Sequence, residues 1–208
     1  MANTFAPSGF LQYQGGAGGA PTFAQSVRRI AAGNTTPIFT GDPVQPVTST
    51  ANGYITQATA GGSVQMAGIF VGCKYYSTSQ KRVIPSPYWP GSDATGDVEA
   101  YVIDDPNARF IVQTSTSSFP ITGTLSTQTS GVQGQYAQFS IGTGNTSTGR
   151  SGAYLSSLAT TATFPFVVID YQVGVQNGGD PTSQYCNVIV GFNNEWLRSN
   201  GAGPTGIS

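Results

Sequence analysis

The stretch VEAYVIDDPNARFIVQT, residues 98–114, decides the fold, because it contains two strand signals separated by one turn signal. Apolar and polar residues alternate over 98–103, as they do on a strand with one buried face. The residues DDPN at 104–107 favour a turn, since Asp, Pro and Asn adopt turn conformations readily. RFIVQT at 109–114 is a second strand signal. The pattern predicts an antiparallel hairpin.

Similar strand signals recur on both sides of this stretch. The segments 164–173 and 185–194 are the clearest, and we expect them to pair. With about eight strand candidates and no confident helix, the sequence indicates an all-β protein: an antiparallel β-barrel or β-sandwich, jelly-roll-like, with long polar loops. Further strands are expected at residues 36–40, 54–59, 64–76 and 135–141.

The composition supports this fold class and excludes several functions. Charged residues make up 8% of the 208 residues and aromatic residues 11%, which fits neither a helical bundle nor a disordered chain. The net charge of -1 provides no basic face for nucleic acid. No apolar run approaches the roughly 18 residues of a membrane-spanning helix. We therefore expect no direct nucleic-acid partner and no membrane partner.

The sequence contains no histidine, which excludes a Ser-His-Asp triad, a Cys-His pair and any zinc site with histidine ligands. Cys73 and Cys186 lack metal-binding spacing, so two buried thiols are expected, with a disulfide as the alternative. The N-terminal residues lack a signal-peptide pattern, so assembly in the cytosol is expected. We expect no catalytic, metal or cofactor-binding residues and no small-molecule substrate.

Three regions are expected along the chain: an extended Gly-rich N-terminal arm at 1–26, a single β-barrel or β-sandwich domain at 27–198, and an irregular tail at 199–208. The arm contains GGAGGA at 15–20, where glycine allows mobility. Its apolar side chains suit burial against a neighbouring chain, with packing against its own domain as the alternative. These candidate interface residues are Phe5, Phe10, Leu11, Tyr13 and Phe23.

The segment KRVIPSPYWP, residues 81–90, is expected to be a proline-stiffened loop that presents Tyr88 and Trp89. Trp and Tyr are common anchors at binding surfaces. Contact with a partner, sugar binding and packing onto its own domain are the three alternatives for this pair. Residues 110–149 carry no charge, and such a surface is better tolerated when it faces a partner.

The acidic residues give only weak signals for chemistry. Asp104 and Asp105 are natural turn residues before a proline. Asp97 and Glu99 share one strand face, where a solvated edge is favoured over a calcium site. A glycosidase would need two suitably spaced carboxylates, and the chain has only two glutamates, the second being Glu195. This is the least favoured alternative.

Several blocks, in this order, resemble head decoration, or cement, proteins of tailed bacteriophages. The resemblance covers about residues 28–198, and none of its blocks is a chemical motif. The family has no catalytic residues to carry over. The blocks are IFTGDPV (38–44), GIFVGCKY (68–75), PYWPG (87–91), DVEAYVIDDPNARF (97–110), SGAYL (151–155) and NVIVGFNNEWLR (187–198).

The resemblance implies a structural virion protein that binds the outer surface of an icosahedral capsid and stabilises the expanded shell. Its expected partners are the major capsid protein and copies of itself, as a homotrimer or a dimer, and it is assembled in the host cytoplasm. Two alternatives stay open. One is a host-recognition or carbohydrate-binding β module with Tyr88, Trp89 and Trp196 as its platform. The other is a low-copy structural protein of the head or tail.

Overall fold

The computed structural model describes residues 3–15, 20, 24–47, 53–122, 131–160, 162–172 and 180–196. Within these residues the protein is all-β and has no helix, so none that could cross a membrane. The strands are β1 (Leu11–Gln14), β2 (Ser26–Ile30), β3 (Ile38–Phe39), β4 (Pro43–Pro46), β5 (Ile55–Gln57), β6 (Gly68–Ser77), β7 (Arg82–Ser86), β8 (Tyr88–Trp89), β9 (Val98–Ile103), β10 (Arg109–Gln113), β11 (Tyr136–Ser140), β12 (Tyr154–Ala159), β13 (Phe166–Tyr171) and β14 (Asn187–Phe192).

One six-stranded antiparallel sheet, sheet A, has the order β1-β10-β14-β13-β11-β12. It curls strongly, because Thr114, directly after β10, forms an isolated bridge with Leu155 in β12. The backbone N of Ser115 donates to the carbonyl oxygen of Leu155 at 3.0 Å. The bridge does not continue as a ladder, so sheet A is curled but is not a closed barrel.

Sheet A encloses the larger of two hydrophobic clusters. Along β10 the side chains of Phe110 and Val112 are buried, and their neighbours Arg109 and Ile111 are only partly buried. This is the period-two alternation that the sequence predicted, because successive side chains of a strand point to opposite faces. Aromatic rings from β10, β13 and β14 pack together at the centre of the cluster.

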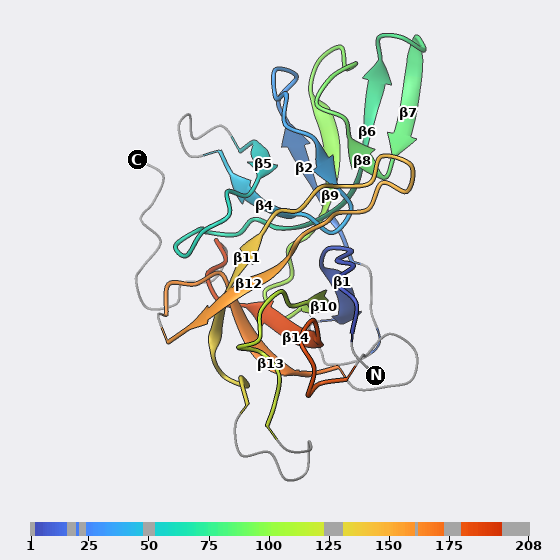
Figure 1. The fold of residues 1–208 in the computed structure, drawn as a ribbon. Coiled ribbons are helices and arrows are strands. Elements are labelled where there is room, and N and C mark those ends of the chain that lie inside the picture. Colours follow the sequence, from blue (N-terminus) through green and yellow to red (C-terminus); the bar gives the residue numbers. More distant parts are fainter. Residues whose placement is uncertain are drawn as a thin grey trace.

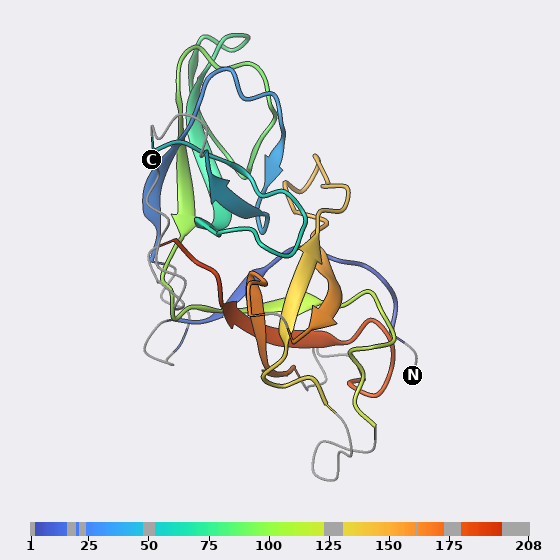
Figure 2. The same ribbon diagram turned by 90° about the vertical axis from the view of Figure 1, so that its left-hand side faces the viewer.

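The second sheet, sheet B, has the order β2-β9-β6-β4-β5, and β7 also pairs with β6. It curls in the same way, since Arg29 of β2 bridges to Tyr54 just before β5. Sheet B encloses the smaller cluster, which includes Trp89 from the two-stranded β3–β8 sheet. In Figures 1 and 2, sheet B lies above sheet A, and its strands run across the direction of β10 and β14.

The two sheets meet at the turn between β3 and β4, where Asp42 is 1% exposed. Its Oδ2 accepts hydrogen bonds from the Phe39 backbone N at 2.8 Å and from the Gln57 Nε2 at 2.9 Å, and its Oδ1 accepts from the Ser151 Oγ. Ser151 lies near the end of the long loop between β11 and β12 of sheet A. Burial raises the pKa of the Asp42 carboxyl. One carboxylate therefore ties segments of both sheets together.

The predicted hairpin at 98–114 is wrong, although both of its strands are present. β9 lies in sheet B between β2 and β6, whereas β10 lies in sheet A between β1 and β14. The turn between them carries the chain from one sheet to the other. Asp105 shapes this turn, since its Oδ1 accepts from the Asn107 backbone N at 2.9 Å and its carbonyl accepts from the Ala108 backbone N at 3.0 Å.

Other predictions are confirmed. β13 pairs with β14, as expected for 164–173 and 185–194. A register shift between Val168 and Asp170 leaves the Asp170 side chain exposed within this otherwise apolar strand. Both cysteines are buried and free. Burial raises the pKa of Cys73 to about 12 and also raises the pKa of Cys186.

The loop predicted at 81–90 is wrong, because this segment contains β7 and β8. β7 pairs only with β6, and an edge position of this kind tolerates the missing N–H of Pro85. The sequence signals also missed β2 and β12. Both are short strands at the ends of their sheets.

Candidate interaction surfaces

The N-terminal segment, residues 3–14, packs against sheet A of its own chain. Phe10 is 2% exposed, and its ring stacks on Phe166 at a centroid distance of 4.5 Å. β1 pairs antiparallel with the edge of β10, where Leu11 lies opposite Ile111. Of the predicted interface residues in the arm, Phe10 is therefore a core residue and Leu11 is half-buried. In the single chain, the N-terminal segment therefore packs against its own domain, which was the alternative to burial against a neighbouring chain.

The remaining aromatic residues of the arm differ in position. Phe5 is 41% exposed and its ring contacts those of Tyr154 and Tyr185, each at 5.1 Å. Tyr13 is 37% exposed on β1. Phe23 and the tail at 199–208 lie outside the described residues. The predicted boundaries of arm, domain and tail stay predictions.

Two side-chain amides hold the first part of this segment through hydrogen bonds to backbone groups. The Asn3 Nδ2 donates to the Asp180 carbonyl at 2.9 Å, and the Asp180 backbone N donates to the Asn3 Oδ1 at 2.8 Å. The Gln113 Nε2 donates to the Thr4 carbonyl at 2.9 Å, and the Ala6 backbone N donates to the Gln113 Oε1 at 2.8 Å. The Gln113 amide thus pairs with the backbone of the segment much as a neighbouring strand would.

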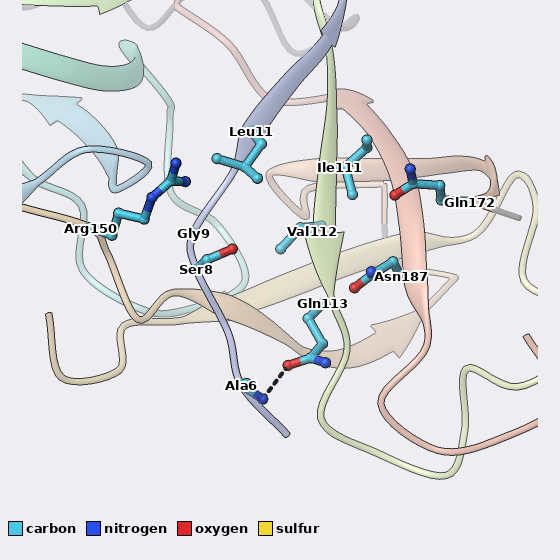
Figure 3. A pocket seen from close by; sticks show the side chains of 10 residues that line it. All are labelled: Ala6, Ser8, Gly9, Leu11, Ile111, Val112, Gln113, Arg150, Gln172 and Asn187. Carbon is cyan, nitrogen blue, oxygen red and sulfur yellow. Dashed lines mark hydrogen bonds between the residues drawn. The ribbon is translucent and has the colours of Figure 1, made fainter. Parts of the chain in front are cut away.

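Between this segment and sheet A lies a cavity of about 450 Å³. Figure 3 shows the segment passing between Arg150 on one side and β10 and β14 on the other. The polar side chains of Gln113, Gln172 and Asn187 line the cavity from the sheet. The N-terminal segment therefore forms one wall of the cavity and is not pressed flat onto the sheet along its whole length.

Tyr88 and Trp89 do not form an exposed platform. The Trp89 side chain is fully buried, its Nε1 donates to the Asn34 carbonyl at 3.2 Å, and its ring meets that of Tyr75 edge-on at 5.3 Å. Tyr88 is half-buried, and its ring stacks on Phe39 at 5.1 Å. Both residues thus pack within their own chain. This was one of the three alternatives for the pair.

The third member of the predicted sugar platform, Trp196, lies elsewhere. The Arg28 guanidinium lies over its ring at 4.8 Å from the centroid. The same Arg28 forms an ion pair with Asp104 at 2.5 Å, and Asp104 also accepts from the Ser26 Oγ at 2.7 Å. Asp104 therefore anchors β2, a role that its turn-like sequence context did not indicate.

Part of the charge-free segment, residues 110–149, packs against other parts of its own chain. The loop between β11 and β12 reaches the β3–β8 pair, where the backbone N of Thr40, directly after β3, donates to the Gly149 carbonyl at 2.9 Å. A Cβ at Gly144 would lie 2.2 Å from the Phe39 ring, and one at Gly149 would lie 2.5 Å from Pro87. Only glycine allows this close packing onto the β3–β8 pair. Residues 123–130 of the charge-free segment lie outside the described residues.

The most exposed apolar surface lies on sheet B, on the face that points away from its hydrophobic cluster. The strand register places three rows of side chains across it. Val27, Tyr76 and Val83 are 61%, 44% and 55% exposed, and the last two lie directly opposite each other on β6 and β7. We call this surface the outer face of sheet B; it comprises Val27, Arg29, Gly72, Lys74, Tyr76, Val83, Pro85, Glu99 and Tyr101.

A small charged group crosses the middle of this outer face. The Glu99 Oε1 accepts a hydrogen bond from the Tyr101 hydroxyl at 2.8 Å and lies 3.4 Å from the Lys74 Nζ. The hydrogen bond from Tyr101, and then the charge of Lys74, lower the pKa of Glu99. Beside this group, Gly72 and Pro85 line a shallow hollow of about 400 Å³ together with Tyr101. The outer face thus combines apolar side chains with an internally neutralised ion pair.

The acidic residues are dispersed. Glu99 lies on the outer face of sheet B, whereas Glu195 is fully buried after β14, where its backbone bridges to Met66. The Asp97 carboxylate accepts a hydrogen bond from the Tyr54 hydroxyl. In the part of the chain that the structure describes, no three Cys, Asp or Glu side chains gather into a metal-binding group.

The resemblance to phage decoration proteins extends only to the blocks quoted above. What the chain does is therefore inferred from its own residues and surfaces. No family model, no curated protein sequence and no solved structure matches this chain.

Proposed function

We propose that this chain is a structural virion protein that binds the outer surface of an icosahedral phage capsid and stabilises the expanded shell. The observation that carries the proposal is the outer face of sheet B. Val27, Tyr76 and Val83 are large apolar side chains, each more than two fifths exposed, on one face of one sheet. Tyr76 and Val83 form an exposed apolar pair, and Val27 lies on the same face beyond the ion pair of Lys74 and Glu99. Exposed apolar side chains on one face support a protein interaction site.

The proposed mechanism is mass action. A protein that binds only the expanded lattice stabilises that lattice in proportion to the binding free energy of each copy. Because the sites repeat by symmetry, each contact can be modest and the sum still large. The net charge of -1 suits contacts made by shape and hydrogen bonding, with little long-range steering. The major capsid protein is the proposed partner, with copies of this chain arranged as a trimer or dimer.

The positions of the resembling blocks support this proposal. They supply the central strands β6, β9, β10 and β14 and the turn at Asp42 that joins the two sheets. The blocks therefore contain the residues that set the framework.

The proposal is tested by co-sedimentation of the purified protein with expanded empty heads of the parent phage. We expect binding to saturate at a copy number set by the capsid lattice, with no binding to unexpanded heads. Saturation at a few copies per head would instead indicate a low-copy structural protein. Absence of binding would overturn the proposal and favour the recognition module, which a glycan array would then test.

A matched pair of variants tests which surface docks. Tyr76→Ser removes an aromatic ring from the outer face of sheet B, and Tyr13→Ser makes the same change at similar exposure on sheet A. We expect Tyr76→Ser to weaken shell binding at least tenfold and Tyr13→Ser to leave it unchanged. The reverse result would assign docking to the N-terminal segment and remove sheet B from the interface.

A further inference from the structure

We propose that the N-terminal segment, residues 3–14, exchanges between copies of this chain. In the isolated chain it binds its own sheet A, and in an assembly it binds sheet A of a neighbouring copy. The occupant of the groove on sheet A is the same segment in both states. This exchange concerns contacts between copies and does not depend on capsid binding.

The contacts that hold the segment act between groups that need not belong to one molecule. The Gln113 amide binds the backbone of Thr4 and Ala6, and the Asn3 amide binds the backbone of Asp180. The pairing of β1 with β10 is likewise a backbone ladder. An identical segment from a second copy makes the same bonds, and this identity is the basis of domain swapping.

Sheet A is incomplete without this segment. Phe10 supplies a fully packed ring to the cluster against Phe166, and β1 covers the edge of β10. An empty groove would leave an aromatic-sized cavity and an unpaired strand edge, both of which are costly. The groove is therefore filled in every folded state, by the chain's own segment or by that of a neighbour.

The connection to the rest of the chain is long enough for either arrangement. Eleven residues, Gly15–Gln25, join β1 to β2, and four of the six residues in GGAGGA are glycine. A link of that length spans at most about 40 Å. This exceeds the roughly 30 Å diameter of a small domain, so the groove of an adjacent copy is within reach.

Effective concentration decides which arrangement is populated. A segment tethered by a link of this length meets its own groove at an effective concentration of about a millimolar. Free protein at micromolar concentration therefore keeps the segment on its own sheet. When copies are held side by side in an assembly, the groove of a neighbouring copy is present at a comparable effective concentration. Exchange of the segment then costs little free energy, and it links the copies together.

The exchange is tested by cross-linking between two variants. Ala6→Cys places a thiol on the segment and Asn187→Cys places one on β14; both positions line the same cavity (Figure 3), and the native thiols are buried. The two variants are mixed at micromolar and at millimolar concentration, incubated, and treated with a short thiol-to-thiol cross-linker. We expect a covalent pair of chains that increases at least tenfold at the higher concentration.

The controls make the result decisive. Ala6→Cys mixed with itself should give little of this product, and the double variant should cross-link within one chain at low concentration. If the millimolar mixture yields no more covalent pairs than the self-mixed control, the proposal is overturned. This readout uses free protein, so its failure would leave the proposed capsid role untouched.

Shortening the link provides an independent test. Deletion of residues 15–22 leaves three residues between Gln14 and Ser26, which should prevent the segment from reaching its own groove. We expect this variant to form a discrete oligomer by light scattering, and Phe10→Ala in the same background to return it to a monomer. A folded monomer of the deletion variant at all concentrations would contradict the exchange.

Discussion

Sheets A and B resemble each other in size and curl but cover their apolar surfaces differently. Sheet A is completed by the chain's own N-terminal segment, which places Phe10 in its cluster and β1 along its edge. Sheet B keeps Tyr76 and Val83 exposed on its outer face, while Pro85 interrupts its edge strand. The edge at β7, interrupted by proline, resists pairing with another strand, which supports our proposal that sheet B docks through its face.

The joint between the sheets and the β6–β7 hairpin of sheet B hold their carboxylates differently. Asp42, at the joint, is buried and its pKa is raised, chiefly by loss of solvent. Asp93, beside the β6–β7 hairpin, is partly exposed, and its pKa is lowered by hydrogen bonds from Ser77 and Ser79. The contributions of these two aspartates to the stability of the fold therefore change with pH in opposite directions.

Phe10→Ala should have the largest effect on this comparison, because it leaves a cavity in the cluster of sheet A. We expect a loss of about 3–5 kcal/mol in the free energy of unfolding, measured by urea denaturation. Phe5→Ala is the control, since its ring is 41% exposed and should cost much less. Equal losses for the two variants would show that the segment is not part of the core.

Asp42→Ala should destabilise the joint by about 3 kcal/mol, because buried donors from Phe39, Gln57 and Ser151 lose their acceptor. Asp42→Asn keeps one acceptor oxygen and should cost less. The measurement is the denaturation midpoint of both variants. If the alanine variant is as stable as the native chain, the Asp42 carboxylate does not stabilise the joint between the sheets.

The pH dependence sharpens the test at Asp42. Because its folded pKa lies above its unfolded value, its stabilising contribution is present below the unfolded pKa and is lost as pH rises through the folded pKa. Asp42→Asn should abolish this loss. Across the acidic range, the unfolding free energy of the native chain should therefore fall as pH rises and that of the variant should not, so that the difference between the two narrows with rising pH.

Asp93→Asn should have a smaller effect with the opposite sign. The folded pKa of Asp93 lies below its unfolded value, so its contribution is present above the unfolded pKa and is lost as pH falls through the folded pKa. The variant should be less stable than the native chain near neutral pH and should match it in strong acid. A constant difference at all pH values would mean that its charge is not involved.

Tyr76→Ser and Val83→Ser should have the smallest effects on stability. Both side chains lie on the outer face of sheet B, and surface substitutions of this kind usually change the unfolding free energy by less than about 0.5 kcal/mol. Thermal unfolding of the free protein measures this directly. A large loss of stability would show that the face is structural, and any loss of shell binding could not then be read as docking.

Strand positions were more predictable than strand partners. The alternation over 98–103 and 109–113 identified β9 and β10, but the turn between them did not reveal that each strand joins a different sheet. Turn residues specify local backbone conformation, whereas pairing depends on which distant apolar faces are buried together. The segment 82–86 was missed as a strand because Pro85 and its short apolar run resemble a loop.

The candidate site was less predictable than the fold. An aromatic residue on a Gly- or Pro-rich segment gives the same sequence signal whether it faces solvent or core. Phe10 and Trp89 prove to be core residues, while Val83, which carried no special signal, is among the most exposed apolar side chains. Exposure is a property of the packed chain, so composition and spacing could not distinguish these positions.

The sequence by itself determined the all-β class and most of the strands, and it favoured two buried thiols over a disulfide. These follow from local alternation, turn chemistry and residue type, each of which acts within a few positions. Only the tertiary structure decided that the chain divides into two curled sheets, that Asp42 joins them and that the N-terminal segment completes sheet A. Such features depend on contacts between residues up to 180 positions apart, which no local pattern encodes.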